Sequence, residues 1–157
     1  MLEKIKRFVV SIAIPMVVGI IAAAITRGNM DISSLKQPPL APPALVFPIA
    51  WSVLYILMGV SAAVVWARRG EAPEEVKRGL RFYAISLLLN FLWSPVFFNL
   101  REFRLSLIIL AAMLYFLIRT MISYGRVKPI AAYLQIPYAL WLIFAGYLNA
   151  GFMILNG

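Results

Sequence analysis

Long uncharged apolar runs divide this chain, and most of them are long enough to cross a lipid bilayer as helices. Four of these runs occupy residues 8–26, 37–67, 82–100 and 129–157. A fifth run, residues 105–118, reaches membrane length by continuing to residue 123, because the guanidinium of Arg119 can extend to the lipid headgroups. Spanning the hydrocarbon takes about 20 residues of helix. The sequence therefore predicts an all-α polytopic membrane protein built as a five-transmembrane-helix bundle.

We expect a single membrane domain over residues 1–157. Its predicted spans are residues 8–26, 44–66, 82–100, 105–123 and 130–155. Continuous rather than alternating apolar residues exclude a transmembrane β-barrel. The first run is long for the apolar region of a cleaved signal peptide, so we interpret it as a span. Residues 27–43 form the longest connection, and their four closely spaced prolines favour a stiff, extended lid or a mere rigid linker.

The distribution of positive charge predicts how the chain is oriented. The net charge is +9, but the basic residues flank the predicted spans, so we expect no nucleic-acid partner. Eleven of the 15 Lys and Arg residues lie before the first span, between the second and third spans, or around residues 119–128. By the positive-inside rule, this asymmetry predicts a cytoplasmic N-terminus and a C-terminus on the far side.

The residue types inside the spans restrict the chemistry of any internal site. All six acidic residues lie outside the apolar runs, and the chain has no His and no Cys. A site within the membrane can therefore use aromatic rings, amides and hydroxyls, but no carboxylate, imidazole or thiolate. We predict no metal site, no required cofactor and no conventional catalytic residue. An ion-coupled transporter is disfavoured, because a proton relay would have no titratable members.

Three predicted helices carry an aromatic face near mid-span, because their residues recur at helical spacing. The predicted ligand-binding residues are Phe47, Trp51 and Tyr55 in the second span, Asn90, Trp93 and Phe97 in the third, and Tyr138, Trp141, Ala145, Leu148 and Asn149 in the fifth. The three tryptophans lie roughly 12–18 Å below the membrane surface, too deep for the interfacial aromatic belt. We assign Trp66 and Tyr83, at span ends, to that belt.

Two asparagines at membrane depth need hydrogen-bond partners, so Asn90 and Asn149 should point into the bundle. They either line a pocket or clamp neighbouring helices together. Glycines at residues 59 and 146, each four residues before an alanine, predict close packing of helices within the bundle. An aromatic cavity of this kind favours flat ligands, because each ring–ring pair adds about 0.5–1.5 kcal/mol beyond burial of area.

Three segments resemble signatures of the translocator protein family, also called tryptophan-rich sensory proteins (TspO/MBR). They are residues 42–55 (PPALVFPIAWSVLY), 89–98 (LNFLWSPVFF) and 137–149 (PYALWLIFAGYLN), in the order and spacing of the family. The resemblance implies a five-helix bundle with a pocket beneath the first loop. It also implies that Trp51, Asn90 and Trp141 line the pocket, and that Ala145 is a ligand-sensitive position.

The family's known ligands set the functional expectation. The resemblance implies a membrane receptor or carrier that binds porphyrins, haem and similar planar lipophilic molecules, with a sensory or tetrapyrrole-transport role. The alternative that it implies is a light-dependent porphyrin-degrading enzyme using Trp51 and Trp141. The expected partners are a tetrapyrrole or related ligand and the lipid bilayer, and a homodimer is left open.

The chain departs from the family pattern in the first loop and after the third signature. Leu40 and Leu45 stand where the family's loop usually has tryptophans, and Pro48 replaces a glycine. A loop with fewer indole rings should bind tetrapyrroles less well. No Lys or Arg follows Tyr147, which weakens the case for sterol binding.

Overall fold

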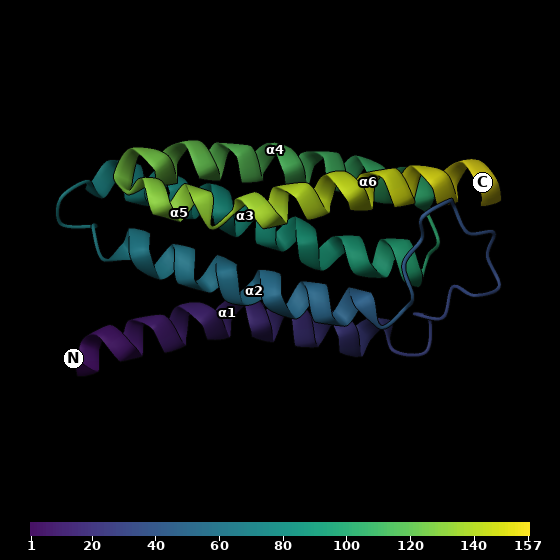
Figure 1. Ribbon diagram of the computed structural model, residues 1–157, viewed down its shortest axis with the longest axis horizontal. Helices are drawn as coiled ribbons and strands as arrows, with labels where there is room; N and C mark the ends of the chain where they lie inside the picture. The colour runs from purple at the N-terminus through teal and green to yellow at the C-terminus, as the bar shows by residue number, and fades with distance from the viewer.

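A computed structural model describes residues 1–157 and contains helices but no strands. Its helices are α1 (Leu2–Thr26), α2 (Val46–Trp66), α3 (Pro73–Phe98), α4 (Phe103–Val127), α5 (Pro129–Tyr133) and α6 (Ile136–Asn156). By length and composition, α1, α2, α3, α4 and the α5–α6 segment can each cross a membrane. The predicted all-α bundle of five spans is confirmed (Figure 1).

Two helices begin well before the predicted spans. α1 begins at Leu2 rather than residue 8, and α3 begins at Pro73 rather than residue 82. Proline at a first helical position, followed by Glu74 and Glu75, suits a helix N-terminus because both carboxylates favour the positive end of the dipole. At 1.5 Å per residue α3 is roughly 39 Å long, so its first turns extend beyond a hydrocarbon layer of about 30 Å.

The burial of the Tyr83 hydroxyl speaks against the assignment of this residue to the interfacial belt. Tyr83 lies ten residues into α3, and its hydroxyl is buried inside the bundle. Trp66, by contrast, is the last residue of α2 and is exposed, with the guanidinium of Arg69 4.6 Å from its ring centroid. The position of Trp66 therefore fits an interfacial anchor, whereas Tyr83 belongs to the core.

The fifth span is broken into two helices. Leu134 and Gln135 separate α5 from α6, just before Pro137. The proline ring has no N–H to donate and clashes with the preceding turn, so a helix ends before it and a new one begins around it. Pro15 and Pro95 remain inside α1 and α3.

The helices pack as two groups, α1 with α2 and α3 with α4, α5 and α6, and the contact of α1 with α3 joins them. α1 packs along α2, α3 packs along α4, and α4 packs against both α5 and α6. Four residues connect α3 to α4 and one connects α4 to α5, so these helices are antiparallel neighbours, as predicted. α2 makes little contact with α3, although α1 contacts both (Figure 1). This arrangement leaves space beside α2 that side chains only partly fill.

The core has a larger and a smaller part. Leu54, Met58, Met113 and Leu142 belong to the larger cluster, in the middle of the bundle. The smaller cluster consists of Val65, Val76, Tyr124 and Ala131. The outward faces, above all on α1, carry exposed valine and isoleucine, as expected where lipid is the solvent.

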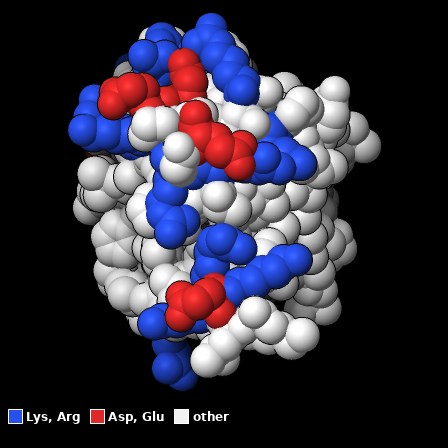
Figure 2. Space-filling model, turned by 90° about the vertical axis from the view of Figure 1, so that its left-hand side faces the viewer, with Lys and Arg blue, Asp and Glu red and all other residues white.

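The two ends of the bundle differ in charge. The N-terminus, residues 67–72 and Lys128 lie at one end, named here the basic end, while residues 27–45 and 99–102 lie at the other, the loop end (Figure 1). Figure 2 shows Lys and Arg side chains gathered over the basic end, with a few acidic ones among them. Glu75 accepts hydrogen bonds there from Arg78 at 2.7 Å and Arg126 at 3.4 Å. The charge asymmetry counted in the sequence is therefore an asymmetry between the ends of one bundle.

Candidate functional site

The main cavity lies between α1, α2 and α3, towards the loop end, and has a volume of about 190 Å³. Its lining residues are Met16, Gly19, Ile20, Ala22, Ala23 and Thr26 of α1, Met30 of the first loop, Phe47, Pro48, Trp51, Ser52 and Tyr55 of α2, and Trp93, Ser94 and Phe98 of α3. No charged side chain is among them. The cavity therefore favours an apolar ligand with a few hydrogen-bonding groups.

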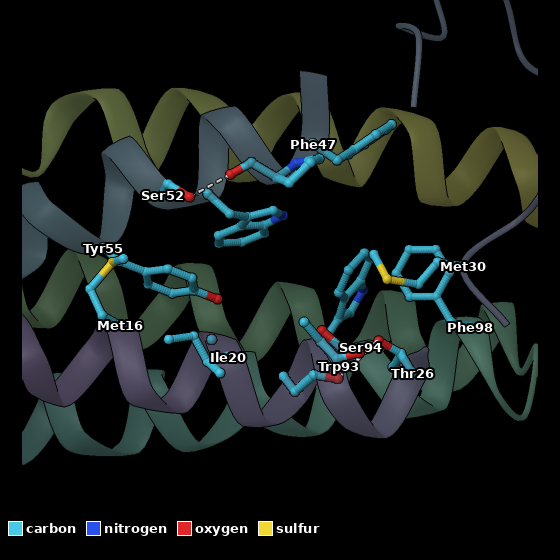
Figure 3. A pocket seen from close by; sticks show the side chains of 15 residues that line it. Met16, Ile20, Thr26, Met30, Phe47, Ser52, Tyr55, Trp93, Ser94 and Phe98 are labelled. Atoms are coloured by element: carbon cyan, nitrogen blue, oxygen red, sulfur yellow. Dashed lines mark hydrogen bonds between the residues drawn. The ribbon is translucent and has the colours of Figure 1, made fainter. Parts of the chain in front are cut away.

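Aromatic rings form one wall of this cavity. The rings of Trp51 and Tyr55 are stacked, with centroids 5.6 Å apart and planes 26° apart. Figure 3 shows Tyr55 and Phe47 on the α2 side and Trp93 and Phe98 on the α3 side of the space. Residues 47, 51 and 55 share this side because each is one helical turn from the next, as their spacing predicted.

Small residues form the opposite wall, on α1. The ring of Tyr55 lies directly on Gly19, where a Cβ atom would overlap it. Ala22 and Thr26 continue the same face and are buried. α1 approaches α2 equally closely at Gly59, where a methyl group would overlap the backbone of Ile12. The close packing predicted at residue 59 is therefore packing within the bundle.

A second, much smaller cavity of about 20 Å³ lies on the other side of Phe47, Trp93 and Phe98, which border both spaces. Its other lining residues are Ile32, Phe97, Ala145, Leu148, Asn149 and Phe152. Three aromatic side chains thus separate the main cavity from the interior face of α6.

Both predicted inward-facing asparagines join helices together. Tyr55 donates its hydroxyl hydrogen to Asn90 Oδ1 at 3.0 Å, and Asn90 Nδ2 donates to the Tyr138 oxygen at 3.1 Å. Asn149 Oδ1 accepts a hydrogen bond from Trp93 Nε1 at 3.0 Å, and its Nδ2 donates to the Phe103 carbonyl at 2.9 Å. Of the two alternatives, the clamp describes Asn90, whereas Asn149 is a clamp that also borders the small cavity.

The eleven predicted site residues therefore fall into three groups. Phe47, Trp51, Tyr55 and Trp93 line the main cavity, and Phe97, Ala145, Leu148 and Asn149 line the small one. Asn90, Tyr138 and Trp141 line neither of these two cavities. Trp141 lies behind Trp51, with ring centroids 6.2 Å apart and planes at 85°.

Sequence reasoning missed the contribution of α1. The signal available was a stripe of mostly small residues, Gly19, Ala23 and Thr26, at helical spacing from Met16. Small side chains offer no recognisable chemistry, so such a stripe is normally interpreted as helix packing.

The first loop is fastened to α6 at three places. The backbone N–H of Lys36 donates to Asn156 Oδ1 at 2.8 Å, and Asn156 Nδ2 donates back to the Lys36 carbonyl at 3.0 Å. The Tyr147 hydroxyl donates to the Pro39 carbonyl at 2.6 Å. Pro38 packs on Gly151, whose missing Cβ makes the close approach feasible.

The two halves of this loop have different positions. Met30 and Ile32, before the prolines, border the main and the small cavity respectively. A turn follows, in which hydrogen bonds from the side chain and backbone N–H of Ser33 hold the pKa of the Asp31 carboxyl below its usual value. The Pro-rich half lies against α6 instead, and the side chain of Leu40 is 83% exposed. The half that precedes the prolines is therefore the part of the loop that borders the two cavities.

Five membrane-length helices, three of which enclose an aromatic, uncharged cavity, define a multi-pass α-helical membrane protein. The family model described as the TspO/MBR family matches residues 11–155, and the chain belongs to that family.

Relatives from bacteria and mammals support the same assignment. The chain is 37% identical over 123 residues to Protein CrtK of Rhodobacter capsulatus, covering 78% of this chain and 76% of that protein. It is 36% identical to the Tryptophan-rich protein TspO of Chlorobaculum tepidum, over 79% of this chain and 78% of that protein. It is 35% identical to the Translocator protein of Bos taurus, over 87% of this chain and 82% of that protein.

Proposed function

We propose that this protein binds a flat, lipophilic ligand, with porphyrins and haem as the leading candidates, between α1, α2 and α3. The observation that carries the proposal is the stacked pair of Trp51 and Tyr55, which forms a planar aromatic wall in a cavity without charged groups. A ring system lying against this wall would gain about 0.5–1.5 kcal/mol per aromatic pair beyond the burial of its area.

The cavity is too small to hold a tetrapyrrole without expanding. Its volume of about 190 Å³ is below the roughly 300–1,000 Å³ of most small-molecule sites. A tetrapyrrole therefore requires expansion, either by movement of α1 or by rotation of the rings of Phe47 and Phe98. The small cavity behind those rings lies in the direction in which the space can grow.

The ends of the bundle suggest how such a ligand would be oriented. Arg27 is exposed and directly follows Thr26, whose side chain lines the cavity. A porphyrin with its rings in the cavity and its carboxylates toward Arg27 would satisfy both its apolar and its anionic parts. We further propose that the N-terminus is cytoplasmic, which places the Arg27 end of the cavity on the far side of the membrane.

A titration in detergent tests the proposal. Protoporphyrin is added to the purified protein, and binding is followed by quenching of tryptophan fluorescence. We expect Trp51→Ala to weaken binding by about 2- to 12-fold, the equivalent of one lost aromatic pair. Trp66→Ala is the matched control, because Trp66 lies at the exposed end of α2. Equal affinity of the two variants would remove the assignment to this cavity.

A sensory or carrier role follows from such a site without any chemistry on the ligand. Relatives carry the names Tryptophan-rich sensory protein, in Cereibacter sphaeroides, and Translocator protein, in Bos taurus. Both names agree with binding as the primary event. In a sensory role, we propose that the expanded, ligand-bound cavity is the signalling state. In a carrier role, the bound ligand is what is passed on.

One observation favours the alternative, light-dependent porphyrin degradation. The Trp51 ring lines the cavity and also meets the Trp141 ring edge-on, so an oxidised Trp51 would have a second indole beside it. This activity requires light and dioxygen and should bleach the porphyrin Soret band over several turnovers. Trp141→Phe should slow the bleaching more than it weakens binding, because Trp141 does not line the cavity. Bleaching no faster than with denatured protein would refute it.

A further inference from the structure

We propose that the basic end of the bundle encloses a second site, a chamber among Tyr83, Tyr124 and Gln135 that holds ordered water. Four polar atoms of these residues are buried without a protein partner: the two tyrosine hydroxyls, and Oε1 and Nε2 of the Gln135 amide. Tyr124 is 0% and Gln135 1% exposed, so neither can reach bulk solvent. None of the three residues lines the ligand cavity.

Packing between α3 and α4 brings the two tyrosines together. The ring of Tyr124 lies on Gly79, where an added Cβ would be 2.8 Å from its Cδ1 atom. Tyr83 is one helical turn further along α3, on the same face as Gly79. Tyr83 also packs against the small core cluster that contains Tyr124.

The break in the fifth span brings Gln135 to the same place. Gln135 lies between Ala131 and Tyr138, all three buried, on the inward side of the α5–α6 segment. Ala131 belongs to the small core cluster and Tyr138 to the large one, and Tyr83 packs against both clusters. Gln135 therefore lies in sequence between residues of the two clusters that Tyr83 joins.

Water is the ligand that these groups fit. Nearly all buried polar groups in folded proteins have a partner in the protein or in ordered water, and each one left without costs about 1–3 kcal/mol. A buried water typically makes about three hydrogen bonds. The amide offers a donor and an acceptor, and each phenol offers both, so the four atoms can complete the bonding of one or two waters. None of the four atoms carries a charge that would hold an ion.

On α3, the chamber residues are followed toward the basic end by Glu75, which is partly exposed to solvent. Glu75 lies one turn before Gly79, and its Oε2 atom is also buried without a partner while its Oε1 atom binds the two arginines. Glu75 is part-exposed at the basic end, so it marks the route by which water would exchange.

On its other side, the chamber is connected to the main cavity through hydrogen-bonded side chains. Tyr138 borders the chamber, accepts a hydrogen bond from Asn90, and through Asn90 is linked to Tyr55 in the cavity wall. The proposed water and the proposed ligand would thus lie at opposite ends of one polar path through the bundle.

Hydroxyl-radical footprinting by X-ray irradiation tests for this water, because radicals generated on bound water oxidise the side chains beside it. In the detergent-solubilised full chain, we expect oxidation of Tyr124 and Tyr83 despite their burial. Met58 is the internal control, since it is 1% exposed, carries a readily oxidised sulfur and belongs to the apolar core cluster. Oxidation of Tyr124 no greater than that of Met58 would overturn the proposal.

Gln135→Leu provides the matched variant, because it keeps the side-chain size but removes the amide. We expect the oxidation of Tyr124 and Tyr83 to fall to the level of Met58, with Met58 unchanged. Unchanged oxidation of both tyrosines would overturn the proposal. If the leucine variant does not fold, Tyr124→Phe replaces it, with loss of oxidation at Tyr83 as the expected result and its persistence as the contradicting one. Porphyrin affinity plays no part in these outcomes.

Discussion

Replacing Asn149 by leucine should destabilise the bundle chiefly by leaving the indole N–H of Trp93 without a partner. Asn149 is 1% exposed and receives that N–H at 3.0 Å, while its own amide donates to the Phe103 carbonyl. Leucine has a similar volume, so the substitution removes both hydrogen bonds with little change in packing. The Phe103 carbonyl keeps a second donor, the Ser106 hydroxyl at 3.0 Å, so only the indole N–H is left without a hydrogen-bond partner.

The size of the effect follows from the cost of a buried, unpaired donor. That cost is about 1–3 kcal/mol in proteins generally, whereas interhelical hydrogen bonds measured inside a membrane average about 0.6 kcal/mol, with a maximum near 1.7. Trp93 is 8% exposed and its ring is stacked on Phe97, so the indole cannot turn easily toward another acceptor. We therefore expect Asn149→Leu to lower the free energy of unfolding by about 1–2 kcal/mol.

A double-mutant cycle isolates the contribution of this hydrogen bond. Trp93→Phe removes the N–H and keeps an aromatic ring against Phe97, and its loss of ring area is the same with either residue at position 149. Unfolding by SDS in mixed micelles, followed by far-UV circular dichroism, gives the free energy for each variant. We expect Asn149→Leu to cost less in the Trp93→Phe background, by about 0.6–1.7 kcal/mol. Additive effects of the two substitutions would show that the hydrogen bond contributes nothing.

Three further substitutions test the packing of α1 and the attachment of the first loop. Gly59→Ala should destabilise the protein by about 1–3 kcal/mol in the same SDS assay, because the methyl group would overlap the backbone of Ile12. Tyr147→Phe removes the hydrogen bond to the Pro39 carbonyl and should accelerate amide exchange in the first loop by roughly 2- to 10-fold, measured by mass spectrometry. Leu40→Gly should raise stability by about 1 kcal/mol or less, because residue 40 has φ +67° and an exposed side chain, and a thermal melt would detect it.

The spans were predictable because a bilayer imposes one strict condition, a sufficient length of apolar helix, and the sequence meets it in five places. The lack of hydrogen-bond partners in lipid also predicted that Asn90 and Asn149 face inward. Neither argument could locate the true start of α3 at Pro73, because charged residues are allowed once a helix has left the hydrocarbon. Tyr83 was misassigned because its place at the end of an apolar run does not show that its hydroxyl faces the interior of the bundle.

The site was less predictable, because helical spacing shows which residues share a face but not which helix that face meets. Trp51 and Tyr55 were expected to share one aromatic face of the second span, and Trp51 on that face contacts Trp141 of α6. The open space lies on the other side of Trp51, against α1 and its Gly19. The axial positions of the helices decide that Asn90 meets Tyr55 and another tyrosine rather than a cavity. Those positions depend on packing of the whole bundle, which no single segment encodes.

The reciprocal bonds between Lys36 and Asn156 join residues 120 positions apart in sequence. At a synthesis rate of about 5–20 residues per second, the amide of Asn156 emerges roughly 6–24 s after Lys36. Until Tyr147, Gly151 and Asn156 have been synthesised, the first loop has no anchor on α6, although the residues of α1 and α2 are already available to insert. The contacts that hold the first loop on α6 therefore form only after the residues of α1, α2, α3 and α4 have all been synthesised, so this loop is among the last parts of the bundle to become fixed.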